Sequence, residues 1–152
     1  MNAHEEEADV MEVLLVEDSP GDVRLMQEAF RANQCIHLNV ATDGVEAMAF
    51  LRREGLHGRA PRPNIILLDL NLPKMDGREV LAHIKEDNSL KMIPTVILTR
   101  SEAEADILNS YQLQANCYLS KPVQSDAFEN VVKSINDFWP TKVELPPQKR
   151  SG

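Results

Sequence analysis

Residues Asn64–Gly77 read NIILLDLNLPKMDG, and this stretch decides the fold. The four apolar residues from Ile65 to Leu68 include β-branched side chains and lie between a proline and a turn-rich segment, which predicts a short strand buried on both faces. Asp69 ends this strand. Because ligands bind at the carboxyl ends of the strands in an open parallel sheet, Asp69 is a candidate functional residue. On this stretch alone, an aspartate that caps a turn is an equal alternative.

The composition is that of one globular domain. The chain has 152 residues and a formal net charge of -8, which disfavours binding to nucleic-acid backbones. It contains no apolar run long enough to span a bilayer, and its first ten residues lack the basic and apolar regions of a signal peptide, so we expect a cytoplasmic protein. Cys35 and Cys117 lack the spacing of a metal site or a disulfide framework, and we expect both to be reduced packing residues.

Short apolar runs alternate with amphipathic stretches along the chain, which predicts five strands and five helices. The expected strands are 11–16, 36–41, 65–69, 95–99 and 116–119. The expected helices run from Pro20 to about Asn33, from a cap at Thr42 or Asp43 to about Leu56, from Gly77 through Ile84, from a cap at Ser101 through Tyr111, and from Ser125 to Trp139.

Right-handed crossovers join such elements into one α/β fold. The expected fold is a doubly wound five-stranded parallel sheet of flavodoxin-like type, with the strand order 2-1-3-4-5. We expect this domain to span residues 10–139, between an acidic arm at 1–9 and a flexible tail at 140–152.

Parallel strands would bring five polar side chains to one edge of this sheet. Glu17 and Asp18 follow the first strand, Asp69 the third, Thr99 the fourth and Lys121 the fifth. Carboxylate oxygens with open coordination positions suit Mg²⁺. A lysine can neutralise a phosphoryl group, a threonine can donate a hydrogen bond to it, and an aspartate can be its nucleophilic acceptor. The set therefore indicates phosphoryl transfer onto a carboxylate.

The adjacent carboxylates have a second interpretation. Asp18 or Ser19 can cap a helix that begins at Pro20. Both interpretations can hold together, because strand ends and helix starts coincide in α/β folds.

The chain resembles the response-regulator receiver domains, the CheY-like family, over about residues 11–139. The segments VEDSPGD, LLDLNLPKMDG, LTRSE and YLSKPV carry the resemblance. It implies a cytoplasmic phosphoacceptor that catalyses its own phosphorylation and dephosphorylation and is not an enzyme with a separate substrate. The implied roles are Asp69 as phosphoacceptor, Glu17, Asp18, Asp69 and the Asn71 backbone carbonyl as Mg²⁺ ligands, Thr99 and Lys121 as phosphoryl contacts, Thr99 and Tyr118 as switch residues, and a cis bond before Pro122.

Some segments are similar to the single-domain receivers that serve phytochrome-type histidine kinases, namely SPGDVRL, the loop from His57 to Pro63 and DFWP. This narrower resemblance implies a sensor histidine kinase as donor, with a phosphotransfer protein as a further candidate partner. It also implies a homodimer through the fourth predicted helix, the fifth strand and the fifth helix. Tyr111, Phe138 and Trp139 are candidate anchors, and core packing is the competing explanation for all three.

Two other classes of function are open at this point. A phosphatase of the haloacid-dehalogenase type also uses an aspartate at a strand end, but it wants a second Asp two residues later, where this chain has Asn71. A flavodoxin-like nucleotide- or flavin-binding protein would want a Gly-rich phosphate loop, which the sequence lacks. Apart from the family resemblance, Tyr118 is better explained as a half-buried strand aromatic with its hydroxyl at the surface. Arg100 departs from the receiver pattern, because the position after the threonine is usually small.

Overall fold

The computed structural model describes residues 10–31, 35–100 and 117–138. Its sheet has five parallel strands in the order β2-β1-β3-β4-β5, which confirms the predicted topology. The strands are β1 (Met11–Val16), β2 (Ile36–Ala41), β3 (Ile65–Asp69), β4 (Thr95–Thr99) and β5 (Cys117–Ser120). The described α-helices are α2 (Pro20–Arg31), α3 (Gly44–Arg52), α4 (Gly77–Glu86) and α6 (Ser125–Phe138). The helix predicted after Ser101 lies outside the described residues.

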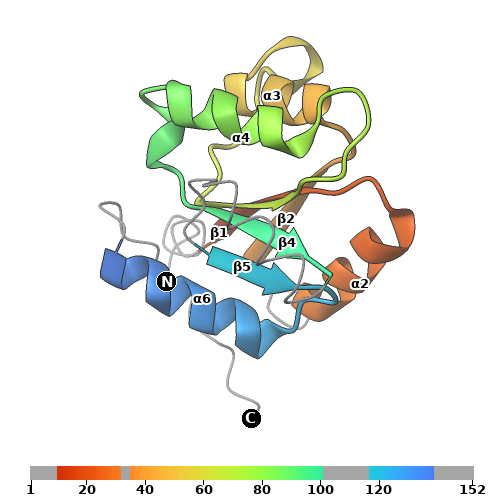
Figure 1. The fold of residues 1–152 in the computed structure, drawn as a ribbon, viewed down its shortest axis with the longest axis vertical. Coiled ribbons are helices and arrows are strands. Elements are labelled where there is room, and N and C mark those ends of the chain that lie inside the picture. Colours follow the sequence, from red (N-terminus) through yellow and green to blue (C-terminus); the bar gives the residue numbers. More distant parts are fainter. Residues whose placement is uncertain (1–9, 32–34, 101–116, 139–152) are drawn as a thin grey trace, which may run out of the picture.

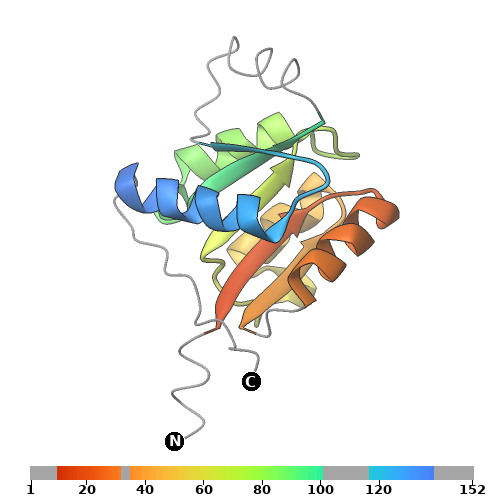
Figure 2. The same ribbon diagram turned by 90° about the horizontal axis from the view of Figure 1, so that it is seen from below.

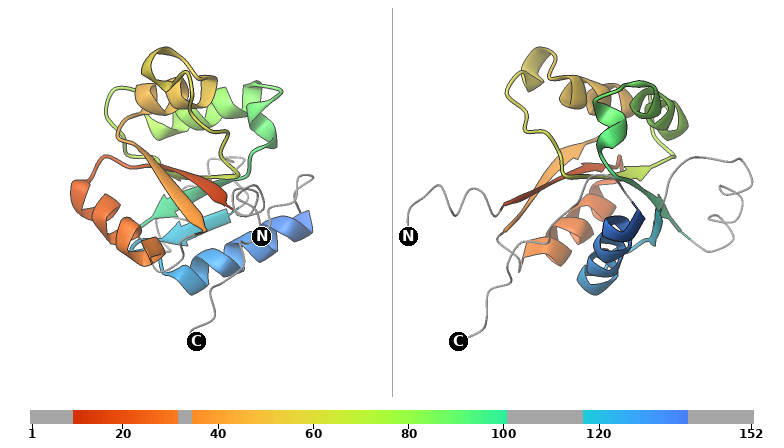
Figure 3. Two further views of the ribbon diagram at one scale, coloured as in Figure 1. Left: turned by 180° about the vertical axis from the view of Figure 1, so that it is seen from behind. Right: turned by 90° about the vertical axis from the view of Figure 1, so that its left-hand side faces the viewer.

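The helices cover both faces of the sheet. Helices α3 and α4 lie on one face, whereas α2 and α6 lie on the other (Figure 1). The view from below shows α2 and α6 in front of the strands (Figure 2). The edge-on view in the right panel of Figure 3 shows the three layers directly. No helix in the described ranges is long and apolar enough to cross a membrane.

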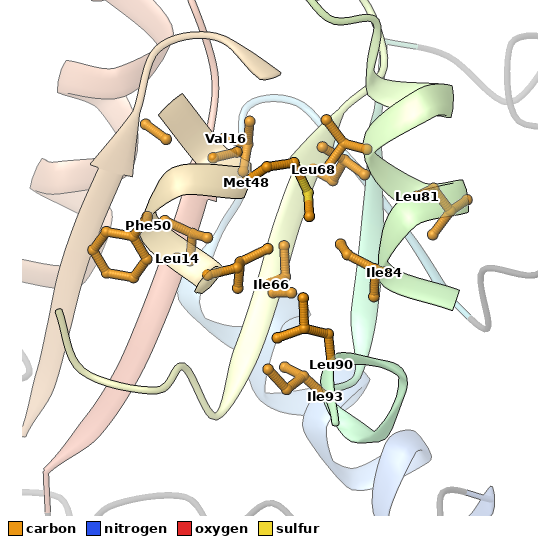
Figure 4. Close-up of a cluster of buried hydrophobic side chains, with 14 of the residues drawn as sticks. Leu14, Val16, Met48, Phe50, Ile66, Leu68, Leu81, Ile84, Leu90 and Ile93 are labelled. Carbon is orange, nitrogen blue, oxygen red and sulfur yellow. The ribbon is translucent and has the colours of Figure 1, made fainter. Parts of the chain in front are cut away.

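The two helical layers enclose two separate apolar clusters, because successive side chains of a strand point to opposite faces. From β3, Ile66 and Leu68 pack toward α3 and α4, in the cluster called here the α3/α4 cluster (Figure 4). Their neighbours Ile65 and Leu67 pack toward α2 and α6. All five residues of β3 are buried, as the prediction from this apolar run requires. β3 is therefore the central strand from which both halves of the core are built.

Helices α2 and α3 begin with side-chain caps at the carboxyl edge of the sheet. The Asp22 backbone N–H donates to Ser19 Oγ at 3.3 Å, which makes Ser19 the cap of α2. The Glu46 backbone N–H donates to Asp43 Oδ1 at 2.7 Å, which makes Asp43 the cap of α3. Both are among the predicted capping residues. The caps satisfy amide donors that the first helical turn leaves unpaired.

Helix α3 is shorter than predicted. It ends at Arg52 rather than near Leu56, because Arg53 takes a left-handed backbone conformation with φ 56°. The Glu54 N–H then donates to the Ala49 carbonyl at 2.9 Å, which closes the helix. A separate 3₁₀ turn, η1, follows at Gly55–His57.

Candidate functional site

Three carboxylates meet at the carboxyl edge of the sheet. Glu17 and Asp18 directly follow β1, and Asp69 is the last residue of β3, which pairs with β1. One ligand oxygen from each residue lies within 4.8 Å of the other two. Glu17 and Asp69 are buried, whereas Asp18 is exposed. The fold thus brings together the acidic residues that the sequence predicted at one edge.

Lys121 joins this cluster from the other end of the chain. It follows β5, and its peptide bond to Pro122 is cis, as the receiver resemblance implied. The Lys121 ammonium donates to Glu17 Oε1 and, at 2.7 Å, to Asp69 Oδ2. The side chains of Lys121, Glu17 and Asp69 are only 10%, 2% and 5% exposed, so these ion pairs are shielded from water.

Asp22 also contacts Lys121, with Oδ2 3.4 Å from the ammonium nitrogen. Asp22 was not among the predicted site residues, because the helical pattern of α2 places it away from the apolar stripe. A usable signal was its position in the first turn. That turn starts at the carboxyl edge of the sheet, so its polar side chains can reach the strand ends.

Burial and charge perturb the ionisation of this cluster. Burial raises the pKa of Glu17 to about 7; the bond from Lys121 opposes this shift, and the nearby Asp69 carboxylate adds to it. Burial alone would lower the pKa of Lys121. Its bonds to Asp69 and Glu17 outweigh that effect and raise the pKa above the ordinary lysine value. Together with Asp18 and Asp22, the site holds more carboxylates than one ammonium can neutralise.

This excess of anionic oxygen fits a divalent cation. The candidate ligands are hard oxygen donors, which suit Mg²⁺ or Mn²⁺. Glu17, Asp18 and Asp69 each offer an oxygen, and the neighbouring Asn71 carbonyl is the further ligand that the receiver resemblance implies. A bound cation would offset the repulsion between the carboxylates that Lys121 alone leaves uncompensated.

The β3–α4 loop (residues 70–76) orients the Asp69 carboxylate. The Asn71 backbone N–H donates to Asp69 Oδ1 at 2.9 Å, while Asp69 Oδ2 accepts from Lys121. The Gly77 N–H donates to the Leu70 carbonyl at 3.0 Å and connects the loop to the start of α4. Both oxygens of Asp69 are therefore held in place by donors, as a reactive carboxylate requires.

The structure describes the other predicted residues to different extents. Thr99 ends β4, but its side chain lies outside the described parts of the structure. Tyr118 packs against the α3/α4 cluster; its hydroxyl is buried and has no hydrogen-bond partner among the described residues. Burial raises the pKa of Tyr118. Arg100 is exposed directly after β4.

The candidate dimer anchors and cysteines are only partly described. Tyr111, Trp139 and the side chain of Phe138 lie outside the described ranges. Cys35 is of intermediate burial, whereas the side chain of Cys117 is outside the described parts.

Comparison with known families identifies the class of protein. A family model described as the response regulator receiver domain matches residues 13–133. The chain belongs to this family and is a receiver-domain response regulator of two-component signalling. Membership implies a sensor histidine kinase as its partner.

Similar proteins include another response regulator, Rcp1, for which a solved structure is known. The chain is 50% identical to the response regulator Rcp1 of Synechocystis sp. over 135 residues, which cover 88% of this chain and 92% of Rcp1. A solved Mn²⁺-bound structure of Rcp1 has a TM-score of 0.67 and covers 90% of this chain and 99% of that one.

Two further solved structures are similar. The phosphorylated cyanobacterial phytochrome response regulator RcpA is 48% identical, with a TM-score of 0.69 and coverage of 91% of this chain and 99% of RcpA. The bacteriophytochrome response regulator AtBRR is 38% identical, with a TM-score of 0.78 and coverage of 89% and 99%.

Proposed function

We propose that this receiver accepts a phosphoryl group on Asp69 from a phytochrome-type histidine kinase, in a reaction that depends on Mg²⁺. The observation that carries the proposal is the Asp69 carboxylate, buried and held by the Asn71 amide and the Lys121 ammonium beside two further carboxylates. The similarity to the phytochrome response regulator RcpA and to the bacteriophytochrome response regulator AtBRR supports the choice of kinase.

In the proposed reaction, an Asp69 carboxylate oxygen attacks the phosphorus of a kinase phosphohistidine. The new P–O bond forms as the P–N bond breaks, and the departing imidazole keeps the electron pair and takes up a proton. Lys121 stays beside the acceptor and neutralises the phosphoryl oxygens. Mg²⁺ held by Glu17, Asp18, Asp69 and the Asn71 carbonyl supplies further positive charge when bound. Attack of water on the phosphorus of the acyl phosphate would later break its bond to Asp69, release inorganic phosphate and regenerate the carboxylate.

The proposed output is a shift between conformations that the receiver already samples. Thr99 would contact the phosphoryl group, and Tyr118 would change position with it. The buried hydroxyl of Tyr118 without a described partner supports this role, because an unsatisfied polar group favours a rearrangement that satisfies it.

The same proposal covers the surroundings of this site. The receiver domain spans residues 10–139 and acts in the cytoplasm, and a phosphotransfer protein is a candidate further partner. The homodimer would form through the segment after Ser101 together with β5 and α6. Catalysis by the chain is limited to its own phosphorylation and dephosphorylation.

Phosphotransfer profiling tests this proposal. Purified histidine kinases, including a phytochrome type, are loaded with labelled phosphate and mixed with the chain in Mg²⁺. We expect rapid transfer from the phytochrome-type kinase and loss of transfer in Asp69→Asn. Asp87→Asn is the matched control, because Asp87 caps the far end of α4, where an asparagine oxygen can accept the same amide bonds. Labelling of Asp69→Asn equal to that of the parent would refute the proposal.

A further inference from the structure

The β3–α4 loop is packed between the first residues of two helices. At Gly77, the start of α4, a Cβ would lie 2.5 Å from the Asp69 carbonyl oxygen. At Gly44, the start of α3, a Cβ would lie 2.7 Å from the Met75 Cβ and closer still to the Met75 carbonyl oxygen. Such distances are shorter than van der Waals contact allows. The loop therefore rests directly on the backbone of α3 at a position where only glycine fits.

This loop has little freedom to move away from an added side chain. Internal bonds close it, from the Leu72 N–H to the Leu70 carbonyl at 3.2 Å and from the Met75 N–H to the Pro73 carbonyl at 2.8 Å. Lys74 adopts a left-handed conformation with φ 67°, which non-glycine residues adopt only at a cost. The Met75 side chain is partly buried against the α3/α4 cluster. A displacement at Met75 would therefore be transmitted to the rest of the loop.

An ion pair adds a second, weaker connection between the loop and α3. Lys74 Nζ lies 3.4 Å from Asp43 Oδ2, while the other oxygen of Asp43 caps α3. The Lys74 side chain is 68% exposed, so water screens this pair. The close contact at Gly44 is the stronger of the two connections.

We propose that Gly44 is a positioning residue for the metal site: its lack of a side chain lets the β3–α4 loop pack on α3 and so sets where the Asn71 carbonyl lies. The loop that packs on Gly44 also donates the Asn71 N–H to Asp69. This inference rests on the proposed function and deepens it, because it assigns part of the Mg²⁺ affinity to α3, a helix that contributes none of the proposed ligands.

The test compares Mg²⁺ binding to the full chain by titration calorimetry. In Gly44→Ala, the added methyl group pushes on Met75, and we expect Mg²⁺ affinity to fall about fivefold or more. Gly58→Ala is the matched control: its backbone is right-handed helical, and its Cβ would meet nothing closer than the Gly55 carbonyl oxygen at 3.7 Å. We expect that control to stay within about twofold of the parent.

Met75→Ala tests the same contact from the side of the loop and adds no atoms to it. This variant can therefore replace Gly44→Ala in the test if Gly44→Ala does not fold. Loss of the Met75 anchor loosens the loop, and we expect Mg²⁺ affinity to fall about threefold. Phosphotransfer at saturating Mg²⁺ should then return to the parent rate in whichever variants fold, because only metal affinity has changed. A general folding defect would not be rescued in this way and would count against the inference.

Failure of the inference is distinguishable from failure of the proposed function. If the parent binds Mg²⁺ and the Gly44 and Met75 variants that fold bind it equally well, the positioning role is wrong and the proposed function stands. If the parent itself takes up no Mg²⁺, the proposed function fails, and the positioning role fails with it.

Discussion

At the residue scale, Lys121 determines whether the acidic cluster is tolerated in the folded protein. It contacts Glu17, Asp69 and Asp22, and the first two are almost fully buried. Carboxylates removed from water need a positive partner, because the interior solvates them poorly. In the metal-free protein, the Lys121 ammonium alone among the described groups neutralises these buried carboxylates, whereas a bound cation would contribute to their neutralisation.

Replacing Lys121 should therefore strongly destabilise the metal-free protein. We expect Lys121→Ala to lower the free energy of unfolding by about 3–5 kcal/mol, because buried carboxylates then lose their partner. Urea denaturation in the presence of a chelator measures this change. Lys133→Ala, at an exposed position of α6, should shift the free energy by less than about 0.5 kcal/mol. A loss of less than about 1 kcal/mol in Lys121→Ala would contradict this account.

Sequence reasoning found most of the residues that form this cluster. Glu17, Asp69 and Lys121 each follow an apolar run, and parallel strands end at a common edge, so their meeting follows from topology. Asp22 was missed because helical periodicity reports which side faces the core, not which polar side chain reaches a strand end. The burial of Glu17 could not be predicted from the sequence either. This burial depends on how α2 and the β5–α6 connection close over the site.

At the element scale, the start of α3 combines capping with contact to the metal-site loop. Asp43 caps the helix with one oxygen and pairs with Lys74 through the other. The bond from the Glu46 N–H lowers the pKa of Asp43; burial opposes this effect, and Lys74 adds to it. The ionised carboxylate is thus favoured in the folded state.

This lowered pKa predicts how stability depends on pH. Because the folded pKa lies below the unfolded value near 3.8, the contribution of Asp43 is present above that value and is lost as the pH falls through the folded pKa. We expect Asp43→Ala to lower the free energy of unfolding by about 1 kcal/mol at about pH 7 and by less at about pH 3, measured by urea denaturation.

Asp43→Asn is the control for this comparison, because its amide oxygen can cap the helix but does not titrate. Its stability difference from Asp43→Ala should stay constant over the same pH range. If the gap between the parent and Asp43→Ala is as large at low pH as at neutral pH, the Asp43 carboxylate does not act as described.

Element boundaries were less predictable than element order. The caps at Ser19 and Asp43 follow from residue type, because short polar side chains accept amide bonds at helix starts. The end of α3 at Arg52 could not be predicted from residue type, because arginine rarely adopts the left-handed conformation that Arg53 takes here. The helix was predicted to run to about Leu56, which is apolar, but the Leu56 side chain is fully exposed in the structure.

At the scale of the whole molecule, one central sheet positions every strand-end residue of the site. β3 lies between β1 and β4 and contributes to both apolar clusters. The strand order was predictable because the alternation of strands and helices, together with right-handed crossovers, leaves few topologies. What the sequence could not supply was the contact of the β3–α4 loop with Gly44, which depends on distances between layers.

The central strand should therefore govern global stability. We expect Ile66→Ala, which empties space in the α3/α4 cluster, to lower the free energy of unfolding by about 2–5 kcal/mol. Urea denaturation followed by circular dichroism measures this. Leu56→Ala changes a fully exposed side chain and should have an effect within about 0.5 kcal/mol. Equal effects of the two substitutions would show that the core is not organised around β3.

The most direct test of the central claim is to locate the phosphoryl group after transfer. The chain is incubated with a labelled, phosphorylated phytochrome-type histidine kinase, once with Mg²⁺ and once with a chelator, and its peptides are mapped by mass spectrometry. The account predicts label on Asp69 in the presence of Mg²⁺ and none when the metal is removed. Label on a different residue, or undiminished labelling in the chelator, would contradict it.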